Sequence, residues 1–438
     1  MASRTGSPRR SAEIPLDRQA IEAAHASLQE HLFETPLLPS PTLSDLTGAR
    51  ILLKAENIQR AGSFKVRGSV NKIRKLAAER TLGEVVAASA GNHAQGVAYA
   101  ASRFGIRATI FMPEDAPIAK RRATERLGGT VNLAGRNYDE SRAAALEYAK
   151  GHDALFIDGF DDWDVIEGQA TIGHEIAQAL GDDAPDVVLV PAGGGGLLAG
   201  VLFYVRDRYG DRTRVIGLQS ERAPALVESI RHLRAGEPPE RLPLATETEP
   251  TIADGVRIGR PGDRPFEVIR RWVDDVVCVR EPSIYEAIVH LYDHSHLVVE
   301  GAGALGVAAL LDDTVVPEPG STVVVVVSGG NVDASLMGKI ITAHLFKTGR
   351  RAVFRFQVKD TPGELARVLA IFEREHLNVA EIQQPPILAK SLSPEYVTFD
   401  VCVETEGEAQ IARVCKVLEE EQAKVRAEGL EPFRVIQR

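Results

Sequence analysis

Short runs of Val and Ile alternate with Ala-rich amphipathic stretches from about residue 15 to residue 347 of the chain. This alternation is typical of βαβ units, in which helices cover a parallel sheet. The predicted buried strands are GEVVAASA, ATIFMP, DVVLVPAG, RVIGLQS and STVVVVVSG. Each run ends in small or polar residues, and α/β sheets bind ligands at the carboxyl ends of their strands. The pattern therefore predicts an α/β region with its chemistry at these strand ends.

The C-terminal part, residues 352–438, follows a different pattern. RAVFRFQV and EYVTFDVCVET alternate apolar and polar residues, as half-buried antiparallel strands do. PGELARVLAIFEREH and EAQIARVCKVLEEE carry apolar residues at helical spacing. The resulting order βαββαβ predicts a separate α+β, ferredoxin-like unit, with a boundary near residues 347–351. At the other end, residues 1–14 are rich in Ser, Arg and Pro and are expected to form a disordered tail.

Composition excludes several classes of protein. The formal net charge of -10 argues against a nucleic-acid partner, because phosphate neutralisation needs a basic face. The chain has 3 cysteines without metal-ligand spacing, so neither a disulfide framework nor a zinc site is expected. No apolar run reaches the roughly 18 residues of a membrane span, and the N-terminus has no signal-peptide core. We expect a cytoplasmic protein with no nucleic-acid or membrane partner.

Lys65 is the first candidate for chemistry. In the segment GSFKVRG it stands between an aromatic residue and glycines, at a predicted junction of loop and helix. Partial desolvation there would lower the pKa of the lysine towards neutrality, which a Schiff-base nucleophile and a proton-abstracting amine both require. Taken alone, the segment also fits a solvated surface lysine. The importance of Lys65 therefore depends on its companions.

Two further segments lie between a predicted strand and a predicted helix. The backbone N–H groups of SAGNHAQG, residues 89–96, could hold a carboxylate, and Asn92 could bond a phenolic oxygen, although an N-capped helix fits equally. PAGGGGL, residues 191–197, exposes consecutive N–H groups before an apolar helix, which suits a phosphate ester. It lacks the Gly-Lys-Ser/Thr of a nucleotide P-loop, so a triphosphate is not expected.

Two glycine-containing segments near the end of the α/β region have to be weighed. GAGALG, residues 301–306, matches the dinucleotide pattern G-x-G-x-x-G, but no strand ending in an acid follows about 20 residues later, so close helix packing is favoured. SGGN, residues 328–331, ends the most hydrophobic strand and is expected at the same sheet edge as the glycine loop. The Ser328 hydroxyl could bond a ring nitrogen without keeping it protonated, which suits a carbanion that eliminates. A plain turn is the alternative.

Taken together and in this order, GSFKVRG, SAGNHAQG, the glycine loop, EGAGA and SGGN resemble the serine/threonine dehydratase family of fold-type II pyridoxal-phosphate enzymes. The resemblance implies a two-lobed catalytic region over residues 15–347, with a smaller lobe of about residues 50–155 inserted in the larger one. It also implies pyridoxal 5'-phosphate as cofactor and an α,β-elimination that converts L-threonine to 2-oxobutanoate and ammonia, and L-serine to pyruvate. An amino acid is then the substrate, and a homo-oligomer, dimer or tetramer, is expected.

The resemblance also implies the role of individual residues. Lys65 matches the Schiff-base lysine, which also takes the substrate's Cα proton. The residues that match cofactor-binding positions are Phe64, Lys65, Asn92, Gly193, Gly194, Gly195, Gly196, Leu197 and Ser328. The residues that match substrate-carboxylate positions are Ser89, Ala90, Gly91, Asn92 and His93. Glu300 could position the substrate or serve in proton traffic, and it could equally be a helix N-terminal acid that complements the dipole.

Serine racemases share most of these motifs but need a second base, a serine where this chain has Ala90. A methyl group cannot accept a proton, so elimination is expected to prevail over racemisation. The divalent-ion ligands of the racemase branch align with Gln219 and Ala225, which supply no carboxylate. No metal ion is therefore expected, although carbonyl groups could hold a monovalent cation.

The C-terminal unit, residues 352–438, resembles an ACT domain through DTPGEL, residues 360–365, and LNV, residues 377–379. ACT domains commonly bind amino acids at shared interfaces, which implies feedback by isoleucine with relief by valine. A purely structural or assembly role stays open. Two other functions also stay open: a serine racemase or β-replacing fold-type II enzyme, and a catalytically idle amino-acid sensor.

Overall fold

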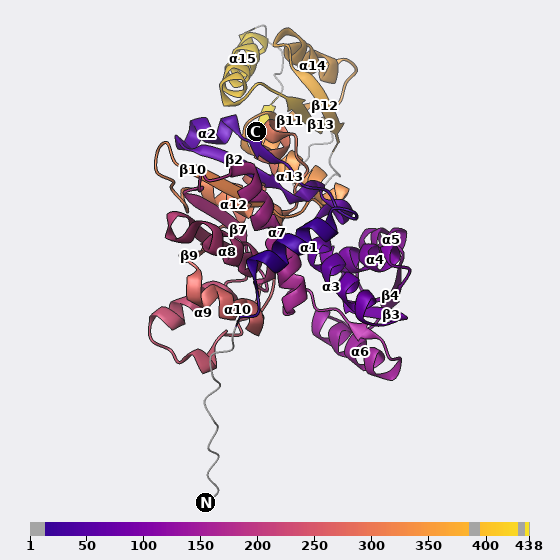
Figure 1. The fold of residues 1–438 in the computed structure, drawn as a ribbon. Coiled ribbons are helices and arrows are strands. Elements are labelled where there is room, and N and C mark those ends of the chain that lie inside the picture. Colours follow the sequence, from indigo (N-terminus) through magenta and orange to yellow (C-terminus); the bar gives the residue numbers. More distant parts are fainter. Residues whose placement is uncertain (1–13, 385–394, 428–433, 438) are drawn as a thin grey trace, which may run out of the picture. The chain divides into compact units, whose positions relative to one another are not determined.

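The computed structural model describes residues 14–384, 395–427 and 434–437 (Figure 1). The chain divides into two compact units, Met1–Asp333 and Ala334–Arg438. Residues 1–13 of the predicted tail lie outside the described residues. Among the described residues, no helix has the length and apolar character needed to cross a membrane.

The larger sheet of the first unit has six strands in the order β1-β2-β10-β7-β8-β9. Its neighbouring strands are parallel except for the pair β1 and β2. The strands are β1 (Leu37–Pro39), β2 (Arg50–Ala55), β7 (Val187–Pro191), β8 (Arg214–Ser220), β9 (Asp275–Val279) and β10 (Thr322–Val327). The helices of this lobe are α1 (Arg18–Leu28), α2 (Pro41–Thr47), α7 (Trp163–Leu180), α8 (Gly196–Tyr209), α9 (Ala225–Arg234), α10 (Asp263–Trp272), α11 (Glu281–Ser295) and α12 (Gly301–Leu311).

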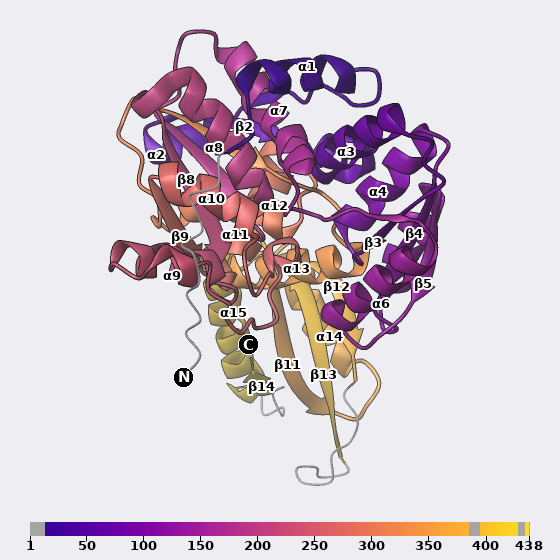
Figure 2. The same cartoon turned by 60° about the horizontal axis from the view of Figure 1, so that its bottom comes forward.

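A smaller, fully parallel sheet has the order β5-β4-β3-β6. Figure 2 shows its strands and helices gathered apart from those of the larger sheet. Its elements are α3 (Lys65–Glu79), β3 (Glu84–Ala88), α4 (Asn92–Arg103), β4 (Arg107–Met112), α5 (Ile118–Arg126), β5 (Gly129–Leu133), α6 (Tyr138–Gly151) and β6 (Leu155–Phe156). Short 3-10 helices join other elements of the first unit: η1 (Glu56–Ile58), η2 (Arg60–Gly62), η3 (Gly210–Arg212), η4 (Pro239–Arg241) and η5 (Asp254–Val256). The smaller lobe starts later than predicted, because β2 pairs with β10 in the larger sheet.

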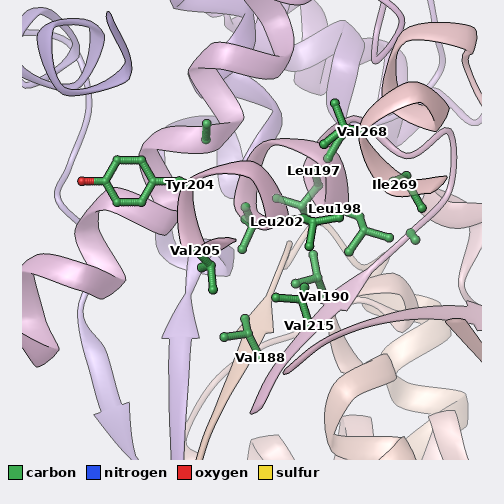
Figure 3. Packing of buried hydrophobic residues seen from close by; sticks show 14 of the residues in the cluster. Val188, Val190, Leu197, Leu198, Leu202, Tyr204, Val205, Val215, Val268 and Ile269 are labelled. Carbon is green, nitrogen blue, oxygen red and sulfur yellow. The ribbon is translucent and has the colours of Figure 1, made fainter. Parts of the chain in front are cut away.

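Helix α8 is anchored on the larger sheet, as Figure 3 shows. Its buried side chains pack against Val188 and Val190 of β7 and Val215 of β8; they are Leu197, Leu198, Leu202 and Val205. A Cβ atom at Gly200 would lie 2.7 Å from the carbonyl oxygen of Ile166, so α8 and α7 pack at a distance that only glycine permits. This packing fixes the start of α8, where the glycine loop lies.

The second unit contains an antiparallel sheet in the order β12-β13-β11-β14. Its elements are α13 (Ala334–Lys347), β11 (Arg351–Lys359), α14 (Glu364–Arg374), β12 (Asn378–Gln383), β13 (Tyr396–Glu404), α15 (Glu408–Ala427) and β14 (Arg434–Gln437). Phe354, Phe356, Phe372 and Val401 are among the residues that form its core. The βαββαβ order is confirmed, as is the α/β class of the first unit. The division falls before α13 and not at residues 347–351, because α13 contacts β11 after a turn at Gly349 (φ 67°).

Candidate active site

Two segments that are far apart in the sequence are joined by their backbones at the site. The Phe64 N–H donates to the Ser328 carbonyl oxygen at 3.1 Å, and the Gly330 N–H donates to the Gly62 carbonyl oxygen at 2.9 Å. Lys65 begins α3 directly after this junction. The GSFKVRG and SGGN segments therefore form one structure at the carboxyl end of β10.

The Lys65 side chain lies inside the site. Its Nζ atom donates to the Gly159 carbonyl oxygen at 2.7 Å and lies 5.3 Å and 5.9 Å from the ring centres of Phe64 and Phe160. Burial lowers the pKa of Lys65 to about 8, against the opposing effect of the Asp158 and Glu300 carboxylates. The direction of this shift is the one predicted from the sequence. A substantial fraction of the amine is thus neutral near physiological pH.

Asn92, the first residue of α4, links two other motifs. Its Nδ2 atom donates to Glu300 Oε1 at 2.6 Å, and its Oδ1 atom accepts from Asn331 Nδ2 at 2.8 Å. Glu300 is the N-cap residue of α12, but its side chain makes no capping hydrogen bond. Burial, reinforced by Asp254, raises the pKa of Glu300 to about 7. Its carboxyl group can therefore hold a proton at neutral pH.

The rest of the segment 89–93 forms the turn into α4. The Gly91 N–H donates to Ser89 Oγ at 3.1 Å, and a Cβ atom at Gly91 would meet no atom within 4 Å. The His93 ring turns to the smaller lobe, where its Nε2 atom donates to the Ile157 carbonyl oxygen at 2.9 Å. Burial and the nearby Lys65 lower the pKa of His93 to about 4, so this imidazole is neutral.

The glycine loop follows β7 and opens into α8. Gly195 has φ 93°, a left-handed conformation, and a Cβ atom there would lie 2.9 Å from Pro265. A Cβ atom at Gly194 would lie 2.4 Å from the Phe160 ring, the same ring that flanks Lys65. The first N–H groups of α8 have no intrahelical partner, and the helix dipole favours negative charge there. The start of α8 thus has the geometry and the dipole that suit an anion.

Ser328 lies at the same edge, because β10 and β7 are neighbours in the sheet. It is 2% exposed, and its carbonyl oxygen accepts from the Phe64 N–H. The GAGALG segment fulfils its packing prediction: Cβ atoms at Gly303 and Gly306 would lie 2.6 Å from the Gly329 carbonyl oxygen and 2.4 Å from Val325. Its glycines allow α12 to lie against the sheet.

Two parts of the site were missed in the sequence. The turn of residues 157–161, which follows β6, supplies the carbonyl oxygen bonded by Lys65. In η5, Asp254 Oδ2 accepts from Lys120 Nζ of the smaller lobe at 2.7 Å. In the sequence, each is marked only by an Asp-Gly pair: Asp158-Gly159 after a short strand, and Asp254-Gly255 in a loop.

Gln219, which the resemblance aligns with a metal ligand of the racemase branch, bonds the backbone of α9. Its Oε1 atom accepts from the Leu226 and Val227 N–H groups at 2.8 Å and 3.0 Å, at the start of α9. Ala225 contributes the first residue of that helix. Over residues 14–384 and 395–427, no three His, Cys, Asp or Glu side chains are grouped so that they could hold a metal ion.

Comparison with known proteins identifies the class. The family described as pyridoxal-phosphate dependent enzyme matches residues 28–329, and the chain belongs to this family. Within it, the chain is 42% identical to an L-threonine ammonia-lyase of Thermotoga maritima over 398 residues, 91% of this chain and 96% of that protein. Because 398 residues exceed the length of the first unit, this similarity extends into the second unit.

Solved structures agree on the catalytic fold. A threonine deaminase from T.th. has a TM-score of 0.66 and 37% identity, covering 73% of this chain and 99% of that chain. A pyridoxal 5'-phosphate-dependent aspartate racemase has a TM-score of 0.68 and 30% identity, covering 74% and 99%. The fold thus accommodates both eliminating and racemising relatives.

The site's own chemistry fits pyridoxal phosphate. A lysine amine with a lowered pKa suits the aldehyde, and the first N–H groups of α8 suit the phosphate. Ser328, a residue that is 2% exposed, brings a hydroxyl group to the end of β10, beside β7. The donors therefore match the three polar parts of the cofactor.

Changing Gly195 to alanine tests the anion loop. We expect the affinity of the apoprotein for pyridoxal phosphate to fall about 5- to 150-fold, because the left-handed conformation and the close Pro265 both disfavour a Cβ atom, at about 1–3 kcal/mol. Equilibrium titration of the apoprotein measures this. Gly210→Ala is the matched control, since Gly210 has φ 62° at the other end of α8 and open space around it. Equal losses of affinity in both variants would refute the assignment of the loop.

Proposed function

We propose that the chain is an L-threonine ammonia-lyase that converts L-threonine to 2-oxobutanoate and ammonia, and L-serine to pyruvate. The observation that carries the proposal is the position of Lys65 Nζ. The Phe160 ring that flanks this atom also lies against the glycine loop at Gly194, and the neighbouring Phe64 is bonded to Ser328 of the SGGN segment. The names of the Thermotoga maritima relative and of the solved threonine deaminase support the choice of substrate.

The position of each residue in the site determines its proposed role in the reaction. Bound pyridoxal phosphate supplies an electron sink for the charge left at the substrate's α carbon. Lys65 anchors the cofactor, and its Nζ atom, once displaced by the substrate, takes the Cα proton. The N–H groups of residues 193–197 hold the phosphate, and the Ser328 hydroxyl bonds the ring nitrogen. Phe64 packs beside the ring.

Residues of the Asn92 turn complete the proposed site. Asn92 Nδ2 has two hydrogens, one of which is committed to Glu300, so the second can bond the phenolic oxygen. The backbone of residues 89–93 holds the substrate carboxylate. Glu300 serves in proton traffic, since its carboxyl group can hold a proton near pH 7 and makes no bond that caps α12.

Ala90 decides between elimination and racemisation in this proposal. The wild-type protein should form 2-oxobutanoate from L-threonine and no D-serine from L-serine, because the Ala90 methyl group cannot return a proton to the second face. Ala90→Ser should gain measurable D-serine formation. Keto-acid release and chiral analysis of serine measure both. D-serine as the main wild-type product, without keto acid, would favour a racemase; no reaction with either substrate would favour an amino-acid sensor.

The second unit is proposed to be an ACT domain that confers feedback by isoleucine, relieved by valine. Its βαββαβ order and the extension of the Thermotoga maritima similarity into it support this assignment. Isoleucine should lower the rate of the full chain at sub-saturating threonine and leave a chain that ends at Asp333 unaffected. Identical titration curves, with cofactor bound in both, would remove the regulatory role.

A further inference from the structure

The turn of residues 157–161 is bonded from both sides at the site. The Ile157 carbonyl oxygen accepts from His93 Nε2 at 2.9 Å, and the Gly159 carbonyl oxygen accepts from Lys65 Nζ at 2.7 Å. A Cβ atom at Gly159 would lie 3.3 Å from the His93 ring, so this ring lies against the turn. The turn is thus enclosed between an imidazole and the lysine amine.

Asp158 shapes this turn from within. Its Oδ1 atom accepts from the N–H groups of Phe160 and Asp161 at 3.1 Å and 2.9 Å. These bonds close the chain around Gly159 and direct its carbonyl oxygen to Lys65. The other carboxylate atom, Oδ2, lies 3.4 Å from Arg142 Nη2 of α6.

Three titratable side chains from three different segments face Lys65: His93, Glu300 and Asp158. His93 of α4 is neutral at physiological pH, and Glu300 before α12 is partly protonated there. Burial alone would raise the pKa of Asp158, but the N–H groups of Asp161 and Phe160, together with Arg142, hold it below its ordinary value. At physiological pH, Asp158 therefore remains ionised, whereas His93 is neutral and Glu300 is only partly ionised.

We propose that Asp158 is the counter-charge of the Lys65 ammonium group, supplied by a turn whose Gly159 carbonyl oxygen holds the same nitrogen atom. Asp158 is a positioning residue, because it acts on the amine through the turn and through its field. The inference rests on the proposed function, in which Lys65 carries the cofactor. It adds a group that controls when the amine is neutral enough to react.

Two substitutions should act in opposite directions. Asp158→Asn keeps an oxygen that can accept the two N–H groups of the turn but removes the negative charge, so the ammonium form of Lys65 loses stabilisation and the amine becomes neutral at lower pH. Arg142→Gln removes a positive charge that competes for Asp158, so the amine should become neutral at higher pH. Arg142 is 40% exposed, and its replacement should not prevent folding.

The test uses the full-length apoprotein mixed with pyridoxal phosphate over a range of pH. The visible absorbance of the lysine-bound cofactor gives the rate of adduct formation, and the midpoint of the pH profile reports the titration of the amine. Relative to wild type, the midpoint should move about one pH unit lower in Asp158→Asn and move higher in Arg142→Gln. The cofactor's own titrations are common to all variants and cancel in this comparison.

Asp182→Asn is the matched control. The Asp182 carboxylate pairs with Arg208 Nη2 at 2.6 Å and is 94% exposed, so the midpoint should stay at the wild-type value. An unchanged or higher midpoint in Asp158→Asn would overturn the inference. If that variant does not fold, an unchanged or lower midpoint in Arg142→Gln would overturn it. Absence of a Lys65 adduct in the wild-type protein, shown by peptide mapping, would instead contradict the proposed function.

Discussion

Replacement of Lys65 by alanine is expected to lower the rate of 2-oxobutanoate formation from L-threonine by about 10⁴-fold or more. A positioned general base alone contributes about 10²–10⁴-fold, and Lys65 is also the proposed covalent anchor of the cofactor. Because the substitution removes a desolvated ammonium group, the fold should survive. Initial rates of keto-acid release, measured on folded protein with excess cofactor, give the result.

Lys75→Ala is the matched control for this prediction. Lys75 lies on the same helix, α3, and its Nζ atom pairs with Asp164 at 2.8 Å and Glu167 at 2.7 Å, away from the site. Its side chain is 30% exposed, so its loss should leave the rate at the wild-type level. A Lys65→Ala protein that is as active as Lys75→Ala would refute the assignment of Lys65.

The largest effect on stability is expected from Glu175→Ala. Glu175 of α7 lies in a buried ionic cluster below α3, where its carboxylate accepts from Arg67 Nη1 and Nη2 at 2.6 Å and 2.8 Å and from Lys54 Nζ. Arg67 is 1% exposed, and so is Lys54. Without Glu175, these two cations share Glu56, so the free energy of unfolding should fall by about 3–5 kcal/mol. Denaturant unfolding measures the change.

Glu237→Ala provides the comparison, since Glu237 pairs with Arg241 at 3.0 Å on the surface and should contribute at most about 1 kcal/mol. The effect of Glu175 should also depend on pH. Despite its burial, Arg67 and Lys54 lower the pKa of Glu175 far below its ordinary value, so its contribution is full above the unfolded-state pKa of about 4.3 and declines as pH falls. Equal losses in Glu175→Ala and Glu237→Ala at pH 7 would contradict this account of the cluster.

Local periodicity was sufficient to predict β3, β4, β7, β8 and β10 of the first unit and the βαββαβ order of the second unit. The runs around β3, β4, β7, β8 and β10 are apolar over the length of a strand, and the alternation in β11 and β13 matches their buried faces. It was not sufficient for boundaries that depend on distant partners. β2 belongs to the larger sheet because it pairs with β10, which comes much later in the chain. Likewise, α13 has an ordinary helical pattern, and only its contact with β11 assigns it to the second unit.

The same distinction applies to the site. Lys65, the glycine loop and Ser328 stand in motifs whose residue types indicate their chemistry. The Asp158 turn and Asp254 have no such motif, and they matter through what approaches them in three dimensions: Lys65 Nζ and Lys120 Nζ. For Glu300, the sequence left two roles open. The structure directs its carboxylate to Asn92 and not to the first turn of α12.

The central claim is that Lys65 binds the cofactor covalently. Borohydride reduction of the purified protein, followed by peptide mapping, fixes the cofactor to whichever lysine holds it. We predict a single modified residue, Lys65, and its loss when L-threonine is present in excess before reduction. Modification of another lysine, such as Lys54 or Lys120, or a protein that carries no modification, would contradict the account.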